Sequence, residues 1–467
     1  MLFRSLDRQI DERVWQSYGA AMHCNGNGAC YNFDPDDAMC PSWKATRQRV
    51  HSPKGRASLM REWLRLQGQA GVNVLEVAQR PQPFLSSLAA RWRNSRAARR
   101  GEADFSHEVY DAMAGCLACK SCAWQCPVKV NVPEFRSRFL ELYHRRYLRP
   151  VRDYLIGSLE FTMPWLARMP ALYNGVMGSP WMRDVLSRRI GMVDGPLLSR
   201  LDLAATLRQW KVRAADAQAL AALSPEQRAR SVVIVQDSFT RYFETGQLQV
   251  LIELAARLGF QVWLAPLLPN GKPLHVQGFM GAFAKAAIRN AAQLAQLAQP
   301  GVALVGLDPA MTLAYRQEYL KVPGMGEVPK VALPQEWLQQ ALPEARTNEG
   351  SAGTAYRLLP HCTEKTNAPD SGKQWAQLFE RRGLRLSVEA TGCCGMSGTY
   401  GHEARNLETS KTIYAQSWAR QIEGKQELGE PLATGYSCRS QVKRLSARQL
   451  RHPLEALLDH VRATHQG

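Results

Sequence analysis

Four cysteines stand close together near residue 120, at a spacing that few kinds of metal site use. They are Cys116, Cys119, Cys122 and Cys126, and Pro127 follows the last of them, so the pattern is C-x2-C-x2-C-x3-C-P. Three thiolates on one tight loop can bind three corners of an iron–sulfur cubane, while the fourth cysteine of such a run points to a neighbouring cluster. Zinc, the alternative metal, more often uses two separated C-x2-C knuckles. The run therefore predicts a [4Fe-4S] cluster.

The fourth corner of that cluster must come from another part of the chain. Cys40-Pro41 repeats the Cys-Pro ending, and Cys24, Asn27 and Cys30 precede it. Cross-ligation predicts two sets: Cys40, Cys116, Cys119 and Cys122 form the first, and Cys24, Cys30 and Cys126, with Asn27 in the fourth position, form the second. The second set could hold a three-iron cluster, a four-iron cluster with a non-thiolate ligand, or no cluster.

A third group of cysteines lies far along the chain: Cys362, the adjacent pair Cys393 and Cys394, and Cys438. Each follows an apolar run that predicts a strand, and α/β folds place ligand sites at strand ends. We expect Gly392 and Gly395 to supply the backbone freedom that adjacent cysteines need. The group predicts a cluster or metal site, and the alternative is a set of buried structural cysteines.

Beyond the cysteine pair, residues 396–403 predict a loop that enters a helix. His402 and Glu403 stand near the expected start of that helix. Either could carry protons or cap the helix, and we expect capping because polar side chains are common there.

The composition is that of a water-soluble globular protein. A chain of 467 residues is too long to fold around a single hydrophobic core, so we expect two to four domains. Apolar residues make up 45% and charged residues 21%, which excludes wholesale disorder. Residues 169–182 are free of charge but too short to span a membrane, and residues 1–13 lack the apolar region of a secretory signal. We expect a cytoplasmic protein.

The net charge of +18 is unusually high. The densest run, residues 91–100, has five arginines but no recognised nucleic-acid motif, so we expect no nucleic-acid partner. Clusters with four thiolates are anionic, and nearby basic residues such as Arg47, Lys54 and Lys120 would raise their potential. The remaining charge suits an acidic partner or a solvated surface.

The predicted elements divide the chain into a helical part and a layered part. Apolar residues recur every three to four positions before residue 150, which predicts helices over 59–66, 83–100, 105–113 and 133–148. Short apolar runs alternate with helical segments after residue 231, which indicates parallel α/β layers. These runs are 231–236, 260–265, 302–306 and 330–334, then 356–360, 384–389 and 431–435.

The two series of strands have nearly the same spacing between corresponding residues. Gly383 comes 21 residues after Cys362 and Gly395 comes 12 later; Gly259 comes 22 residues after Asp237 and Gly271 comes 12 later. The third strands end before Asp308 and Cys438, respectively. We interpret this as a duplicated α/β unit whose first copy lacks cysteines, although any two α/β units could share such spacing.

Between these parts, residues 151–230 predict a helical connector broken by prolines and glycines. Aromatic residues and methionines are frequent in it, including Phe161, Trp165, Met177 and Trp181. This apolar character favours either packing on the protein's own domains or a docking face for a partner or a membrane surface.

Several motifs resemble the iron–sulfur part, in the C-terminal half, of the large bacterial FAD-linked D-2-hydroxyglutarate dehydrogenases, and the resemblance covers essentially the whole chain. More distantly, the chain resembles the iron–sulfur subunit of anaerobic glycerol-3-phosphate dehydrogenase and a heterodisulfide reductase subunit. The motifs are residues 24–30 (CNGNGAC), 39–44 (MCPSWK), 51–57 (HSPKGRA), 235–237 (VQD), 269–272 (PNGK), 392–396 (GCCGM) and 436–441 (YSCRSQ).

The resemblance implies an α+β multidomain fold in which a helical ferredoxin-like 4Fe-4S domain precedes a duplicated α/β domain of the cysteine-rich CCG type. We expect four segments: 1–150 for the iron–sulfur domain, 151–230 for the connector, 231–345 for the copy without cysteines and 346–467 for the copy with them. The sequence departs from the CCG pattern in the first copy and at Gln441, where C-x2-C is usual.

The resemblance also implies an electron-transfer function. We expect electrons to pass from FAD on another domain or a flavoprotein subunit, through the clusters, to a quinone or a soluble carrier, with oxidation of a D-2-hydroxyacid such as D-2-hydroxyglutarate or D-lactate elsewhere. The alternative is a cluster-based or thiol-based reductase. Nothing before Cys24 could hold FAD, so we expect a fragment, a split-gene subunit or a truncated product, with peripheral contact at the inner membrane as a further expectation.

Overall fold

The first part of the chain is a bundle of helices, as the apolar periodicity predicts. The computed structural model describes residues 6, 9–81, 83–342, 355–424 and 426–464. The four expected helices are confirmed as α5, α7, α8 and α10. The elements of this bundle are α2 (Glu12–Ser17), α3 (Gly19–Met22), η1 (Ala29–Tyr31), α4 (Pro41–Thr46), η2 (Arg49–His51), α5 (Pro53–Gln69), α6 (Val74–Gln79), α7 (Phe84–Arg99), α8 (Phe105–Ala114), α9 (Ser121–Gln125) and α10 (Val132–Arg146).

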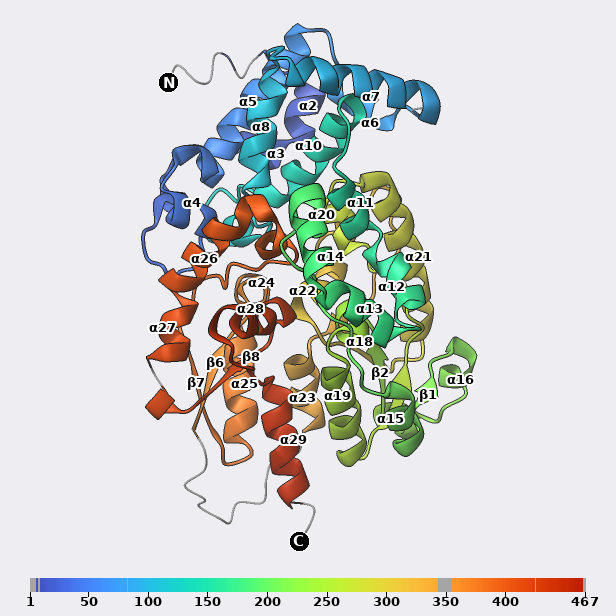
Figure 1. The fold of residues 1–467 in the computed structure, drawn as a ribbon. Helices are drawn as coiled ribbons and strands as arrows, with labels where there is room; N and C mark the ends of the chain where they lie inside the picture. Colours follow the sequence, from blue (N-terminus) through green and yellow to red (C-terminus); the bar gives the residue numbers. More distant parts are fainter. Residues whose placement is uncertain (1–5, 7–8, 82, 343–354, 425, 465–467) are drawn as a thin grey trace.

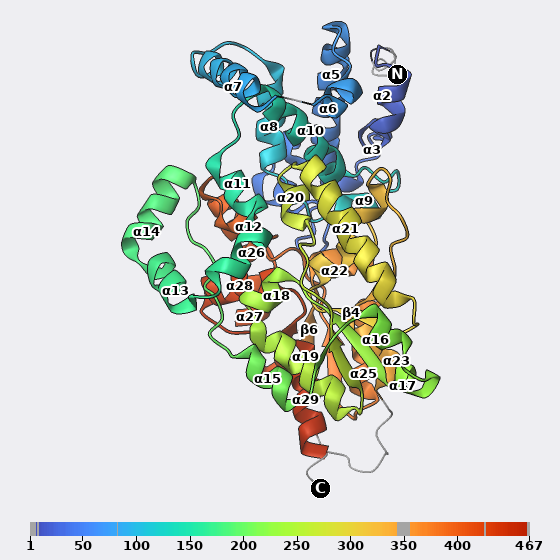
Figure 2. The same ribbon diagram turned by 90° about the vertical axis from the view of Figure 1, so that its right-hand side faces the viewer.

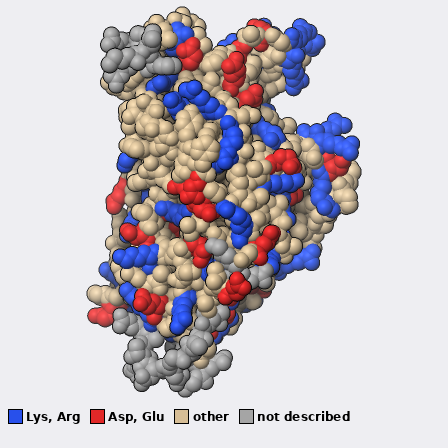
Figure 3. Space-filling model, turned by 90° about the vertical axis from the view of Figure 1, so that its left-hand side faces the viewer, with Lys and Arg blue, Asp and Glu red and all other residues tan. Residues whose placement is uncertain are grey.

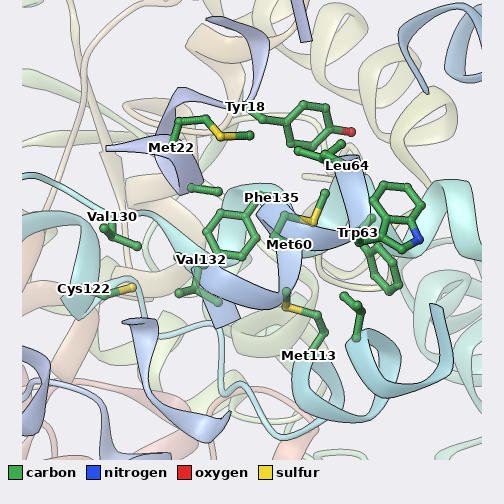
Figure 4. Packing of buried hydrophobic residues seen from close by; sticks show 14 of the residues in the cluster. Tyr18, Met22, Met60, Trp63, Leu64, Met113, Cys122, Val130, Val132 and Phe135 are labelled. Carbon is green, nitrogen blue, oxygen red and sulfur yellow. The ribbon is translucent and has the colours of Figure 1, made fainter. Parts of the chain in front are cut away.

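The core of this bundle forms where α5, α8 and α10 meet. Met60 and Trp63 on α5 face Met113 on α8 and Phe135 on α10, and Figure 4 shows these side chains packed together. Both long helices start at a polar cap followed by proline: the Ser52 hydroxyl accepts the N–H of Gly55, and the Asn131 side chain accepts the N–H of Glu134. The bundle is thereby a rigid support for the cysteine loop between α8 and α9.

The connector consists of short helices, as expected. Its elements are α11 (Val151–Gly157), α12 (Leu159–Leu166), α13 (Pro170–Gly178), α14 (Pro180–Val185), a π-helical turn η3 (Leu186–Ile190), α15 (Leu203–Gln209), α16 (Ala217–Ala221) and α17 (Pro225–Ala229). α13 and α14 project from the body of the ribbon in Figure 2. Several large apolar side chains are exposed here: Phe161, Trp165, Leu166, Met169, Leu172, Val176 and Trp181.

The apolar side chains of the connector divide between buried and exposed positions. Trp165 is 66% exposed and Trp181 is 67% exposed, so packing on the protein's own domains accounts only for side chains such as Met163. Among the described residues, no helix combines the length and the apolar character that crossing a membrane requires.

The third part is a five-stranded parallel sheet with the order β1-β3-β2-β4-β5. Its four main strands fall on the predicted runs, and only the two-residue β1 is unpredicted. The strands are β1 (Arg213–Ala214), β2 (Ser231–Val235), β3 (Gln261–Leu264), β4 (Ala303–Gly306) and β5 (Val331–Ala332). The helices are α18 (Ser238–Tyr242), α19 (Thr245–Arg257), α20 (Lys272–Val276), α21 (Met280–Ala298), α22 (Pro309–Tyr315), η4 (Tyr319–Lys321) and α23 (Pro334–Ala341).

The fourth part is a three-stranded parallel sheet with the order β7-β6-β8. Its strands, β6 (Ala355–Leu359), β7 (Arg385–Val388) and β8 (Glu430–Ala433), again fall on the predicted runs. The remaining elements are α24 (Cys362–Asn367), α25 (Ser371–Glu380), η5 (Tyr400–His402), η6 (Ala404–Asn406), α26 (Leu407–Gln416), α27 (Trp418–Glu423), η7 (Gln426–Leu428), α28 (Tyr436–Ser446) and α29 (Pro453–Thr464).

The two sheets have the same local topology. In the first sheet β2 lies between β3 and β4, and in the second sheet β6 lies between β7 and β8, with all these pairs parallel. The common core of Leu248, Leu254, Trp375 and Leu457 joins the two units. The duplication itself stays a prediction, and the expected boundary between residues 345 and 346 lies outside the described residues.

The helical bundle occupies one end of the molecule, and the sheets occupy the other (Figure 1). Segments that follow β4, β6 and β8 contribute Asp308, His361 and Tyr436 to a cavity that Leu117 of the cysteine loop also lines. The strand ends therefore meet the cysteine loop. On the face that Figure 3 shows, basic and acidic side chains are interspersed.

Candidate iron–sulfur site

The structure brings together the first predicted set of cysteines. Cys40, at the start of α4, lines one cavity with the three cysteines of the loop between α8 and α9: Cys116, Cys119 and Cys122. Cys40, Cys119 and Cys122 are each less than 9% exposed. Four thiols around one cavity fit a cubane cluster, in which each thiolate binds a separate iron.

The cysteine loop has an unusual backbone. Ala118 (φ 55°) and Lys120 (φ 65°), on either side of Cys119, and Cys40 itself (φ 39°) are non-glycine residues in the left-handed region. Such residues cost about 1 kcal/mol or more each and persist where the surroundings fix them, often at functional sites. These left-handed residues shape the loop whose three cysteines line one cavity with Cys40.

Arg56 lines the cavity of this set, and the sequence did not single it out. Arg56 is 1% exposed, and its Nη1 lies 4.0 Å from the sulfur of Cys40. Its Nε donates to the carbonyl of Ala112 at 2.8 Å, which fixes the guanidinium. Burial raises the pKa of Cys40 to about 12, and the charge of Arg56 opposes this effect. The only signal for Arg56 was its place inside the motif at residues 51–57.

Of the three expected cations, Lys120 lines the cavity of the first set and Arg47 and Lys54 do not. Arg47 stacks over Phe33, 4.5 Å from the ring centroid. Lys54 contributes its backbone N–H to Cys30. Lys120 is buried, but its Nζ lies 2.5 Å from a carboxylate oxygen of Glu318, which offsets its charge.

The three cysteines of the second predicted set also lie close together, but Asn27 does not lie with them. Cys24 and Cys126 both lie close enough to Cys30 to raise its pKa, after the larger effect of burial. Asn27 is exposed, and its side-chain oxygen accepts the N–H of Ala29 at 2.9 Å in a local turn. The structure therefore groups three thiols here and turns Asn27 towards solvent.

The third group is a row of buried thiols. Along this row Cys362, Cys393, Cys394 and Cys438 are neighbours in that order, each close enough to the next to shift its pKa. All four are at most 4% exposed. Within the ranges that the structure describes, no three His, Cys, Asp or Glu side chains are arranged to hold a single metal ion.

The glycines beside the cysteine pair are needed for two different reasons. Gly395 has a φ of 85°, as the expectation of backbone freedom requires. Gly392 does not need a positive φ. Its Cβ position would instead lie 2.0 Å from the carbonyl oxygen of Pro35, so the glycine permits a close approach of the helical bundle.

The first and third groups touch, which the sequence did not predict. Cys119 lies in one small buried cluster with Cys362 and Cys393. Cys362 lies near enough to raise the pKa of Cys119, which burial mainly brings to about 12. The hydroxyl of Ser397 donates to the carbonyl of Leu117 at 2.5 Å and holds the two loops together.

His402 and Glu403 do not cap a helix, so that expectation is wrong. α26 begins five residues after His402, whose ring bonds Asp194 of the connector. Glu403 accepts from Arg405 at 3.0 Å and pairs with Arg152 at 3.7 Å. Both residues link the connector to the loop after the cysteine pair. These contacts also give the buried charged groups the partners that they require.

The spacing and grouping of the first two sets can now be compared with known domains. Residues 20–130 match the model of a 4Fe-4S dicluster domain. This range contains all seven cysteines of the two sets. No solved structure gives a significant match to the chain.

Three relatives show the wider context. The chain is 67% identical over 455 residues to a D-2-hydroxyglutarate dehydrogenase of Pseudomonas putida and 47% identical over 463 residues to one of Escherichia coli. These alignments cover 97% and 98% of this chain but 45% of each relative, so the chain spans about half the length of both. One subunit of the anaerobic glycerol-3-phosphate dehydrogenase of Escherichia coli is 28% identical over 199 residues, which is 40% of this chain and 48% of the relative. All three relatives are named as dehydrogenases, which are oxidoreductases.

Proposed function

We propose that this chain is the iron–sulfur electron-transfer module of a flavin-linked D-2-hydroxyacid dehydrogenase. The observation that carries the proposal is the contact between the buried thiol sets, in which Cys119 lies against Cys362 and Cys393. The match to a 4Fe-4S dicluster domain and the dehydrogenase relatives support it.

In this proposal Cys40, Cys116, Cys119 and Cys122 hold one [4Fe-4S] cluster, and Cys24, Cys30 and Cys126 hold a second centre that lacks a fourth thiolate. Clusters bound there would take up and release single electrons. The protein buries the thiols of Cys40, Cys119 and Cys122 and places Arg56 beside Cys40. The row Cys362, Cys393, Cys394 and Cys438 would hold a further cluster, rather than a single metal ion, beside the first.

The electron donor in this account is FAD on another domain or a flavoprotein subunit, where D-2-hydroxyglutarate or D-lactate would be oxidised. The acceptor is a quinone or a soluble carrier. Four arginines of the connector, Arg168, Arg183, Arg188 and Arg189, flank its exposed apolar side chains. Apolar and basic side chains together suit an anionic membrane surface, so we place the working protein in the cytoplasm at the inner membrane.

The two α/β units are, in this proposal, copies of one ancestral unit. Their shared strand order supports this interpretation. In the first copy, Asp237 and Asp308 cap α18 and α22 at the strand ends. In the second copy, Cys362 and Cys438 follow the matching strands. The two aspartates of the first copy therefore stand where the second copy has cysteines.

Expression of residues 1–467 alone, with iron and sulfide reconstituted anaerobically, tests the proposal. We expect dithionite to reduce the bound clusters, and we expect no turnover of D-2-hydroxyglutarate until a flavoprotein is added. Turnover without any flavoprotein would refute this division of roles.

The competing function, a thiol-based reductase acting through Cys393 and Cys394, requires that a substrate reach these sulfurs. They are 3% and 2% exposed. Alkylation by iodoacetamide separates the two functions, because accessible reactive thiols are modified quickly and buried or ligated thiols are not.

A further inference from the structure

Two buried arginines bind the end of α8, where the chain enters the cysteine loop. Arg56 on α5 is 1% exposed, and Arg136 on α10 is 5% exposed. The Nε of Arg56 donates to the carbonyl of Ala112 at 2.8 Å, and the Nε of Arg136 donates to the carbonyl of Met113 at 3.0 Å. Guanidinium groups from two different helices therefore meet adjacent peptide groups just before Cys116.

No carboxylate forms a salt bridge with either arginine among the residues that the structure describes. Arg56 donates further to the carbonyl of His51 and, at 3.1 Å, to the hydroxyl of Ser42. Arg136 donates to the carbonyl of Val276 at 2.5 Å. A buried charge that only uncharged groups solvate is costly. These two positions therefore call for a negative charge nearby.

The thiols of the first set are the groups that can supply this charge. Arg56 lines the cavity of the four cysteines, and its Nη1 lies 4.0 Å from the sulfur of Cys40. Burial lowers the pKa of Arg136, and the charge of the nearby Cys116 is the largest effect that opposes this. Each arginine thus faces a different thiol of the same set.

Other charged groups near the loop do not change this balance at Arg56. Lys120 also lines the cavity, but the carboxylate of Glu318, 2.5 Å from its Nζ, offsets its charge. Glu403 acts on Arg136 through longer-range attraction, and its effect is smaller than that of Cys116. The positive charge beside Cys40 is therefore not offset by a carboxylate.

The charge of a cluster bound at these thiols depends on its oxidation state. Four thiolates make such a cluster anionic, and each electron that it accepts adds one unit of negative charge. A cation within about 4–6 Å shifts the proton equilibrium of a neighbouring acid by about tenfold to a thousandfold. Accepting an electron changes the local charge by one unit, as losing a proton does. Buried cations at this distance therefore favour the reduced cluster.

We propose that Arg56 and Arg136 are the counter-charges of the cluster held by Cys40, Cys116, Cys119 and Cys122, and that they raise its reduction potential. They are positioning residues, since they act through the thiolates. The proposal rests on the electron-transfer function above. The alternative is that both arginines only brace the end of α8, a role that requires hydrogen bonds but no particular effect on the potential.

A potentiometric titration of the anaerobic, reconstituted protein separates these two roles. It follows the electron paramagnetic resonance signal that Cys40→Ser removes. We expect Arg56→Gln to lower the equilibrium constant for one-electron reduction by at least about tenfold, which is about 59 mV. Arg56→Lys keeps the positive charge and should change this constant by less than about threefold.

The matched control is Arg65→Gln, further along α5. Arg65 pairs with Glu62 at 2.6 Å and does not line the cavity of the cysteines. We expect this variant to have the potential of the wild type. Arg136→Gln is the second test variant, and it should lower the potential in the same direction as Arg56→Gln. Iron and sulfide analysis of each sample checks that the cluster is retained.

Two results would overturn the proposal. One is a wild-type potential in both Gln variants at full iron content, and the other is loss of the cluster from Arg56→Lys as well as from the Gln variants, which a brace alone explains. Loss from the Gln variants with retention in Arg56→Lys would support the need for positive charge. In all of these cases dithionite still reduces the wild-type cluster, so the proposed function stands. A wild-type protein without a reducible cluster would instead refute the proposed function itself.

Discussion

The ammonium group of Lys120 lies 2.5 Å from a carboxylate oxygen of Glu318, and both side chains are less than 10% exposed. Lys120 belongs to the cysteine loop, and Glu318 follows α22 in the first α/β unit. Lys272 pairs with the same carboxylate. One buried ionic contact therefore joins the cysteine loop to the α/β unit that contains no cysteine.

Removing this carboxylate should destabilise the protein. Glu318→Gln leaves Lys120 buried without its charged partner, with the amide oxygen of Gln317 as its remaining acceptor, and we expect the free energy of unfolding to fall by about 3–5 kcal/mol. Urea unfolding of the anaerobic holoprotein measures the change. Glu408→Gln, at an exposed pair with Lys411, should change it by less than about 1 kcal/mol. Equal effects of the two variants would contradict the structural role of the buried pair.

The contact at Gly392 should tolerate no side chain. A Cβ there would lie 2.0 Å from the carbonyl oxygen of Pro35, so Gly392→Ala must displace the helical bundle from the third cysteine group. We expect a loss of about 2–4 kcal/mol in unfolding free energy. Gly175→Ala is the matched control, because nothing lies near its Cβ position on α13. A Gly392→Ala protein as stable as that control would show that the two parts do not pack this closely.

Asp237 should make the protein less stable as the pH rises. Burial and Asp308 raise its pKa to about 7 in the folded state, above its usual range. Between pH 5.5 and 8 the unfolded chain has already lost this proton and the folded protein gives it up only near pH 7, so the wild type should lose about 1–2 kcal/mol. Asp237→Asn should lose less over the same range in urea unfolding. Parallel pH profiles would contradict the raised pKa.

The exposed face of the connector should bind anionic lipid. Trp165 and Trp181 are its most exposed aromatic side chains. Replacing both with Glu should reduce cosedimentation with phosphatidylglycerol vesicles by at least about tenfold. Trp92→Glu serves as the control, since Trp92 is 53% exposed on α7, away from this face. If the wild-type protein does not cosediment with the vesicles, the membrane contact is ruled out.

The elements and the local cysteine sets were predictable because they depend on short-range patterns. Apolar periodicity identified α5 and α10, and short apolar runs identified β2 and β6. The cross-ligation rule anticipated that Cys40 would lie near Cys116 and Cys119.

Contacts between distant parts of the chain leave no such pattern in the sequence. Nothing in the sequence places Cys119 against Cys362, because their separation fixes neither distance nor orientation. Arg56 and Glu318 look like ordinary charged residues until the fold buries them. His402 was misinterpreted for the same reason: its partner, Asp194, lies in another segment.

The central claim is that Cys40 completes the cluster of the cysteine loop. Electron paramagnetic resonance of the dithionite-reduced, reconstituted protein tests it most directly, with iron and sulfide analysis of the same samples. The account predicts a reduced [4Fe-4S] signal in the wild type, its loss or strong change in Cys40→Ser, and its retention in Cys24→Ser. An unchanged signal in Cys40→Ser, or zinc in place of iron, would contradict the account.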